Sequence, residues 1–260
     1  MAYETILYDV RDATAHITLN RPKKLNAMNA LCIGEMRAAL ADARADDAVR
    51  VVIISGAGER AFTAGADITE LTAKSSEEMR TYNRQWLALF DDIESLPKPV
   101  IASVHGYATG GGTEMSLTCD FVLCADDSRF GLSEINIGVI PGAGAAVRLT
   151  RWMGRLKAKE ILMLGEFVSG PEAVACGLAN RSVPRGELAR LSAEWAAKLA
   201  KKPPLALAAA KSCVNVGAEA ALPVALEFEL REFLLLFESE DQKEGMSAFL
   251  EKREANFTGR

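Results

Sequence analysis

The feature that most constrains this chain is a run of three glycines, Gly110 to Gly112, between two ordered segments. The residues before it, Val100 to Val104, form a short apolar run whose length suits a buried strand. The segment after it, TEMSLTCD, has a helix-like pattern with Glu114 in its first turn. A helix that opens from a glycine loop presents unpaired backbone N–H groups and the positive end of its dipole. We therefore predict a site here that stabilises an oxyanion.

A second carboxylate, Glu134, follows 20 residues after Glu114, beyond a strand-like FVLCA segment and a turn around Asp126 to Ser128. Taken singly, a glycine run is commonly only a turn, and a glutamate in the first turn of a helix commonly has only a favourable interaction with the helix dipole. Together, two carboxylates beside a backbone oxyanion site predict acid–base chemistry next to a polarised carbonyl group.

A second loop of small residues, Ala64 to Asp67, follows an all-apolar strand at Val51 to Ile54. Small residues allow a ligand to approach the backbone closely, and Asp67 is placed to cap the next turn. The preceding Gly56-Ala-Gly58 imitates a dinucleotide-binding fingerprint. That fingerprint needs its glycines to open a helix, whereas another turn of small residues follows here. The sequence therefore gives no support for a Rossmann domain.

The remaining pattern predicts strands and helices up to about Leu199 and helices alone afterwards. We expect a hairpin over Ile6 to Leu19, a helix capped by Asn29, and a long amphipathic helix between Thr72 and Leu96. After Arg148 the sequence predicts a helix, a turn at Gly170-Pro171, another helix ending at Gly177, and a helix over Leu188 to Leu199. The fold class is α/β or α+β with a helical tail, and we divide the chain into residues 1–199 and 200–260.

Composition narrows the class of protein. The chain is 49% hydrophobic and 25% charged, with a net charge of −5 and a pI near 5.3, which disfavours partners such as nucleic acid or an anionic membrane surface. No apolar run reaches 18 residues, and the acidic N-terminus resembles neither a signal nor a transit peptide. Five cysteines without a C-x-x-C pair fit reduced thiols in the cytoplasm. Only two histidines are present, so we expect no metal or redox cofactor.

At this point the sequence resembles the crotonase, or enoyl-CoA hydratase, superfamily. The resemblance covers nearly the whole chain, in blocks whose order and spacing agree: RPKKLNAMN, AFTAGADITEL, VHGYATGGGTEMSLTCD, FGLSEINIGVIPGAGAAVRLTR and DQKEGMSAFLEKREANF. It implies a spiral of ββα turns with C-terminal helices that mediate trimer contacts, and usually a homohexamer of two trimers.

The resemblance also implies site residues. The thioester oxygen of an acyl-CoA is expected between the backbone N–H groups of Ala64 and Gly111, and Glu114 and Glu134 are the expected catalytic pair. Further residues are expected along the CoA chain, the last two reaching a neighbouring subunit's ligand: Lys24, Leu25, Ala66, Asp67, Ile68, Phe249 and Lys252. Thr113 and the GAGAAVR segment depart from the common family pattern, which leaves the acyl chain length open.

The implied reaction is reversible syn addition of water to a trans-2-enoyl-CoA, giving a 3-hydroxyacyl-CoA in fatty-acid metabolism. We expect Glu114 to be the base, because a helix N-terminus favours its ionised form, and Glu134 to be the acid. An enoyl-CoA isomerase of the same fold needs only one carboxylate, so the presence of both favours hydration. A dehydratase for a specialised hydroxyacyl-CoA stays open as the same reaction in reverse. A non-catalytic or RNA-binding relative is disfavoured by the acidic composition and by the two carboxylates.

Overall fold

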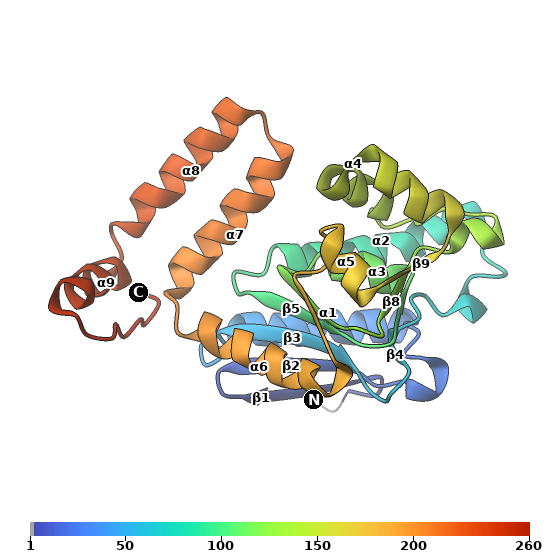
Figure 1. The fold of residues 1–260 in the computed structure, drawn as a ribbon, viewed down its shortest axis with the longest axis horizontal. Helices are drawn as coiled ribbons and strands as arrows, with labels where there is room; N and C mark the ends of the chain where they lie inside the picture. The colour runs from blue at the N-terminus through green and yellow to red at the C-terminus, as the bar shows by residue number, and fades with distance from the viewer. Residues whose placement is uncertain (1–2) are drawn as a thin grey trace.

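The computed structural model describes residues 3–260 and contains a six-stranded sheet as its largest element (Figure 1). The first two strands form an antiparallel hairpin whose turn residues, Asp12 and Ala13, both have left-handed φ angles. All the other neighbours pair in parallel. The strand order is β1 (Ile6–Arg11), β2 (Thr14–Leu19), β3 (Val51–Gly56), β5 (Val100–Val104), β7 (Phe121–Ala125) and β10 (Arg181–Val183).

A second sheet of three-residue strands stands beside the first. Its order is β4 (Ala61–Thr63), β6 (Tyr107–Thr109), β8 (Arg129–Gly131) and β9 (Phe167–Ser169). Successive passes of the chain place one strand in the large sheet, one in the small sheet, and then a helix: α2 (Ser76–Glu94), α3 (Gly111–Ser116) and α4 (Ala145–Leu164). This repeating path is the expected spiral of ββα turns, so the predicted fold class is confirmed.

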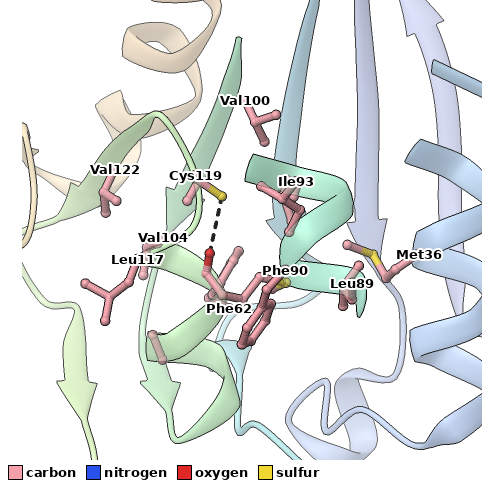
Figure 2. Close-up of a cluster of buried hydrophobic side chains, with 14 of the residues drawn as sticks. Met36, Phe62, Leu89, Phe90, Ile93, Val100, Val104, Leu117, Cys119 and Val122 are labelled. Carbon is pink, nitrogen blue, oxygen red and sulfur yellow. Dashed lines mark hydrogen bonds between the residues drawn. The ribbon is translucent and has the colours of Figure 1, made fainter. Parts of the chain in front are cut away.

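Alternating side chains of the large sheet supply two separate cores. Val51, Ile53 and Ile101 point to one face, where α6 (Arg185–Ala200) covers them. Val52 and Ile54 point to the other face, toward the main core, which also includes residues of α1 (Ala30–Ala45) and α2. Figure 2 shows side chains of this main core gathered between the strands and helices. Because central strands are buried on both faces, the Val51–Ile54 run is apolar throughout.

The local signals at helix starts account for most helix boundaries. Asn29 accepts a hydrogen bond from the Cys32 N–H at 3.0 Å, as predicted for the cap of α1. The long amphipathic helix begins at Ser76, later than expected, because Ser75 and Glu78 form a capping box there. The predicted turn at Gly170-Pro171 is wrong: these residues open α5 (Gly170–Ala175), directly after β9. Proline fits the first turn of a helix, where its missing N–H has no intrahelical partner.

The C-terminal helices α7 (Pro204–Glu219), α8 (Leu222–Leu236) and α9 (Glu240–Glu251) extend away from the two sheets as an arm (Figure 1). Lys211 of α7 joins this arm to the body, because its ammonium group donates to Asp120 Oδ2 at 2.8 Å and to the Ile93 carbonyl at 2.9 Å. No residue of α8 is buried. Within residues 3–260, the structure has no helix of the length and apolarity that a membrane crossing requires.

Candidate active site

Glu114 lies in the first turn of α3, where the chain passes directly from the small sheet into a helix. Gly110 is the N-cap and has a φ of 51°, a conformation that favours glycine. All six residues of α3 are buried, and Glu114 is only 4% exposed. The sequence therefore places a carboxylate inside the protein at a helix start, as predicted from the glycine run.

Backbone groups from a distant segment hold the Glu114 carboxylate. Its Oε1 accepts hydrogen bonds from the N–H groups of Ala143 at 2.9 Å and Ala145 at 3.2 Å, where α4 begins. Burial nevertheless raises the pKa of Glu114 to about 7, with a smaller contribution from the neighbouring Glu134. The backbone donors favour the ionised form of Glu114, as expected at a helix N-terminus, but desolvation has the larger effect on its pKa.

Glu134 approaches the same glycine cap from another segment. It begins the 3-10 turn η3 (Glu134–Ile137), which follows β8. A Cβ atom on Gly110 would lie 2.8 Å from Glu134 Oε1, so the carboxyl group rests against the glycine backbone. Its Oε2 is buried and has no hydrogen-bond partner within residues 3–260, and burial raises the pKa of Glu134. Two carboxyl groups of raised pKa thus flank the start of one helix.

The two glycine-containing loops touch each other. A Cβ atom on Gly65 would lie 2.5 Å from the Thr109 carbonyl oxygen and 2.9 Å from the Gly111 nitrogen. The Trp86 ring packs against Gly111, since a Cβ atom there would lie 2.6 Å from Trp86 Cη2. Within the part of the chain that the structure describes, the Gly111 N–H has no acceptor. It is free to donate to a ligand, as predicted.

The predicted donor Ala64 is wrong, because its N–H already donates to the Leu25 carbonyl at 2.9 Å. The next residues show where a free donor lies. Met28 donates to the Gly65 carbonyl at 2.7 Å and accepts from the Asp67 N–H at 2.9 Å, which makes a parallel bridge between Met28 and Ala66. In such a bridge the N–H of Ala66 points away from Met28, to the opposite edge. It has no acceptor in residues 3–260, so Ala66, and not Ala64, has an N–H that is available to a ligand.

Side chains around the loop explain its shape. Thr63 Oγ1 donates to the Asn26 carbonyl at 2.7 Å and accepts from the Gly65 N–H at 3.0 Å. Asp67 is 6% exposed, caps the turn η2 (Ile68–Glu70), and pairs with Arg21 at 3.0 Å. A hydrogen bond from Thr69, followed by smaller contributions from the basic partners, lowers the pKa of Asp67 to about 2. The Asp67 carboxylate is thus engaged within the protein, and a contact of this residue with the CoA chain stays a prediction.

The other expected CoA contacts fall into two places. Lys24, Leu25 and Ile68 surround the Ala64–Asp67 loop: Lys24 is exposed and reaches Asp67 Oδ2 at 3.3 Å, and Ile68 is 57% exposed. Phe249 and Lys252 lie at the end of α9, on the arm that Figure 1 shows apart from α3. Within one chain they do not join the site, so their contact with a neighbouring subunit's ligand stays a prediction.

Thr113 has a structural role that its sequence position did not reveal. Its hydroxyl donates to the Ala108 carbonyl at 2.7 Å and accepts from the Gly131 N–H at 3.2 Å, so it joins β6 to β8 beneath the glycine cap. The GAGAAVR segment likewise supplies the two donors to Glu114, a role that sequence reasoning missed. Cys119 lies in the main core, where its thiol contacts the Met115 carbonyl at 3.4 Å (Figure 2).

Comparison with known proteins identifies the family. The description of the matching family is enoyl-CoA hydratase/isomerase, and the match covers residues 9–260. A probable enoyl-CoA hydratase from Rhizobium meliloti is 41% identical over 260 residues, 100% of each chain. A crotonyl-CoA hydratase from Syntrophomonas wolfei is 38% identical over 257 residues, 99% of each chain. The crystal structure of an enoyl-CoA hydratase from Bacillus anthracis superposes with a TM-score of 0.95 at 35% identity, covering 99% of this chain and 100% of that one. Because the family match spans residues 9–260 and relatives are 38–41% identical over almost their whole length, this chain belongs to the enoyl-CoA hydratase/isomerase family.

Proposed function

We propose that this protein is an enoyl-CoA hydratase, which adds water reversibly to a trans-2-enoyl-CoA. The observation that carries this proposal is the meeting of Glu114 and Glu134 at the Gly110 cap. Hydration moves two protons, one from the attacking water and one to the substrate carbon, so it employs two carboxyl groups in different protonation states. Moving a double bond requires only one such group, which makes isomerisation the weaker candidate.

The contacts of the two carboxyl groups suggest their roles. Glu114 Oε1 faces only N–H donors, which favour a carboxylate, so Glu114 is the base that takes a proton from water as oxygen bonds to Cβ. Glu134 Oε2 is buried and meets no donor within the described residues 3–260, a setting that favours the protonated acid, so Glu134 gives its proton to Cα. Because the groups act as a pair, their apparent pKa values in a rate profile belong to both.

The thioester oxygen is stabilised by the N–H groups of Gly111 and Ala66. Negative charge develops on this oxygen as the enolate forms, and preorganised donors lower the energy of that state. Removing one such donor typically costs about 2.7–4 kcal/mol of barrier. Since proline is accepted at the first position of a helix, Gly111→Pro removes the N–H without removing a hydrogen bond of α3, although its Cβ would press on Trp86.

A matched pair of variants isolates this donor. Gly111→Ala and Gly111→Pro both place a Cβ atom against Trp86, but only the proline variant loses the N–H. We expect kcat of Gly111→Pro to fall about a hundredfold below that of Gly111→Ala. Equal rates for the two folded variants contradict the oxyanion assignment.

The activity itself is tested with crotonyl-CoA, by following the loss of the conjugated thioester absorbance. Hydration by the wild-type protein, with product identified as 3-hydroxybutyryl-CoA, supports the proposal. Conversion of a 3-enoyl-CoA to a 2-enoyl-CoA without hydration identifies an isomerase instead. Release of water from a specialised 3-hydroxyacyl-CoA, with no turnover of crotonyl-CoA, identifies a dehydratase.

The proposal includes a cytoplasmic homohexamer. All five cysteines are free, as suits a reducing compartment. Large apolar side chains of α8 are more than half exposed, including Leu222, Val224, Leu226, Phe233 and Leu235. An apolar surface of this kind commonly marks a protein–protein contact. A monomer in light scattering at micromolar concentration is incompatible with this part of the proposal.

A further inference from the structure

The segment that holds Glu114 is itself held from its far side by α2. The peptide group between Gly142 and Ala143 donates its N–H to Glu114 Oε1 at 2.9 Å, while its carbonyl accepts from Asn83 Nδ2 at 2.7 Å. One peptide plane therefore joins Asn83 to Glu114. Since linked hydrogen bonds polarise one another, Asn83 strengthens the donor that Glu114 uses.

The next peptide group is fixed by an arginine. Arg148 Nη1 donates to the Ala143 carbonyl at 3.0 Å. Its Nε and Nη2 donate to Glu94 Oε1 at 2.9 Å and Oε2 at 2.8 Å, which is a bidentate ion pair with the last residue of α2. The Arg148 and Glu94 side chains are 22% and 35% exposed. A planar guanidinium held at two points keeps its third donor in a fixed direction.

The backbone leaves room for this guanidinium only because residue 144 is glycine. Gly144 has a φ of 106°, and a Cβ atom there would collide with Arg148 Nη1. The Phe90 ring lies 6.0 Å from the guanidinium carbon on another side. The Ala143–Ala145 donors are thus set by a built arrangement of an arginine, a glutamate and a glycine.

We propose that Arg148, locked by Glu94, is a positioning residue that aims the Ala143 and Ala145 N–H groups at Glu114 and thereby sets its proton affinity. The inference rests on the proposed function, in which Glu114 is the base. Arg148 touches no reacting atom in this scheme and acts through the backbone and through its charge. Its positive charge also favours ionisation, and so lowers the pKa of Glu114 that burial raises.

The test compares Arg148→Gln with a control on the same helix. Arg151→Gln breaks an ion pair with Glu219 on α7 and leaves the donors to Glu114 intact. For Arg148→Gln we expect kcat to fall roughly tenfold to a hundredfold, with little change in KM, since small misplacements at a site carry costs of this order. The acidic limb of the kcat/KM profile should move to higher pH. Arg148→Lys keeps the positive charge but loses the bidentate contact with Glu94. Compared with Arg148→Gln, its pH profile should lie closer to that of the wild type, while its kcat should be restored to a smaller extent.

A second readout does not depend on activity. The melting temperature of each variant is followed across pH in the wild-type background and again with Glu114→Gln. Arg148→Gln should move the Glu114-dependent transition to higher pH in the first background and show no such movement in the second. A transition that stays in place, together with an unshifted rate profile, overturns the inference. A third outcome is that the melting transition moves while neither the wild type nor any variant hydrates crotonyl-CoA. In that case the positioning role stands and the proposed function fails.

Discussion

Replacing Glu114 by glutamine should stabilise the protein at high pH while it removes activity. Glu114 is 4% exposed, and burial raises its pKa from the usual 4.5 to about 7. A group whose folded pKa lies above its unfolded value favours the folded state when protonated. That contribution is complete below pH 4.5 and is lost as the pH rises through 7. Above pH 7 the wild-type protein carries a buried charge that the glutamine variant lacks.

The magnitude follows from the two pKa values. Each pKa unit corresponds to 1.36 kcal/mol, so the difference between 4.5 and about 7 amounts to about 3 kcal/mol above pH 7. Glutamine retains an oxygen that accepts from Ala143 and Ala145, so the backbone contacts survive the substitution. For a domain of this size about 3 kcal/mol corresponds to roughly 6–12 °C in melting temperature. The difference should shrink toward zero at pH 4.5.

Thermal unfolding of wild type and Glu114→Gln, at one protein concentration between pH 5 and 9, measures this difference. Glu4→Gln serves as the control, because Glu4 is exposed and its side chain makes no hydrogen bond within residues 3–260. Its melting curve should follow the wild type at every pH. A gap between Glu114→Gln and wild type that is the same at pH 5 and pH 9 would falsify the claim that burial raises this pKa.

Three further predictions concern activity and the glycine cap. Glu114→Gln and Glu134→Gln should each lower kcat at least about a hundredfold with little change in KM for crotonyl-CoA, and the double variant should lose less than the product, as initial rates will show. Gly110→Ala should cost about 1–3 kcal/mol of stability in denaturant titrations, because alanine is strained at a φ of 51° and its methyl group meets Glu134; an unchanged midpoint contradicts this. Dialysis against a chelator should leave the rate unchanged, since the proposed chemistry uses only carboxyl and N–H groups. Loss of activity on dialysis that one added metal restores contradicts this prediction.

Sequence reasoning reached five strands of the large sheet, all except β10, together with the main helices and both glutamates, because their signals are local. Val51–Ile54 is apolar over a whole strand, and Asn29 caps a helix within three residues. The small sheet was missed because three residues, as in β4, are too few to show a strand period.

The site details that sequence reasoning missed depend on contacts between distant residues. Whether Ala64 or Ala66 offers a free N–H is decided by hydrogen bonds to Leu25 and Met28, which lie about forty residues earlier in the chain. The protonation of Glu114 depends on burial and on donors 29 and 31 residues away. The helix start was a correct guide to where Glu114 lies, whereas its pKa is set by burial and by these distant donors.

The contact between Gly65 and Gly111 allows evolution to change which acyl group the site accepts without changing the spacing of its two backbone loops. The spacing between the loops is fixed by main-chain atoms, with no room for even one methyl group. Exchanging side chains around the site therefore leaves this main-chain contact between the two loops unaltered. New acyl groups can be accommodated by such exchanges while the enolate-forming step is inherited intact, so diversification of substrates does not require the chemistry to be reinvented.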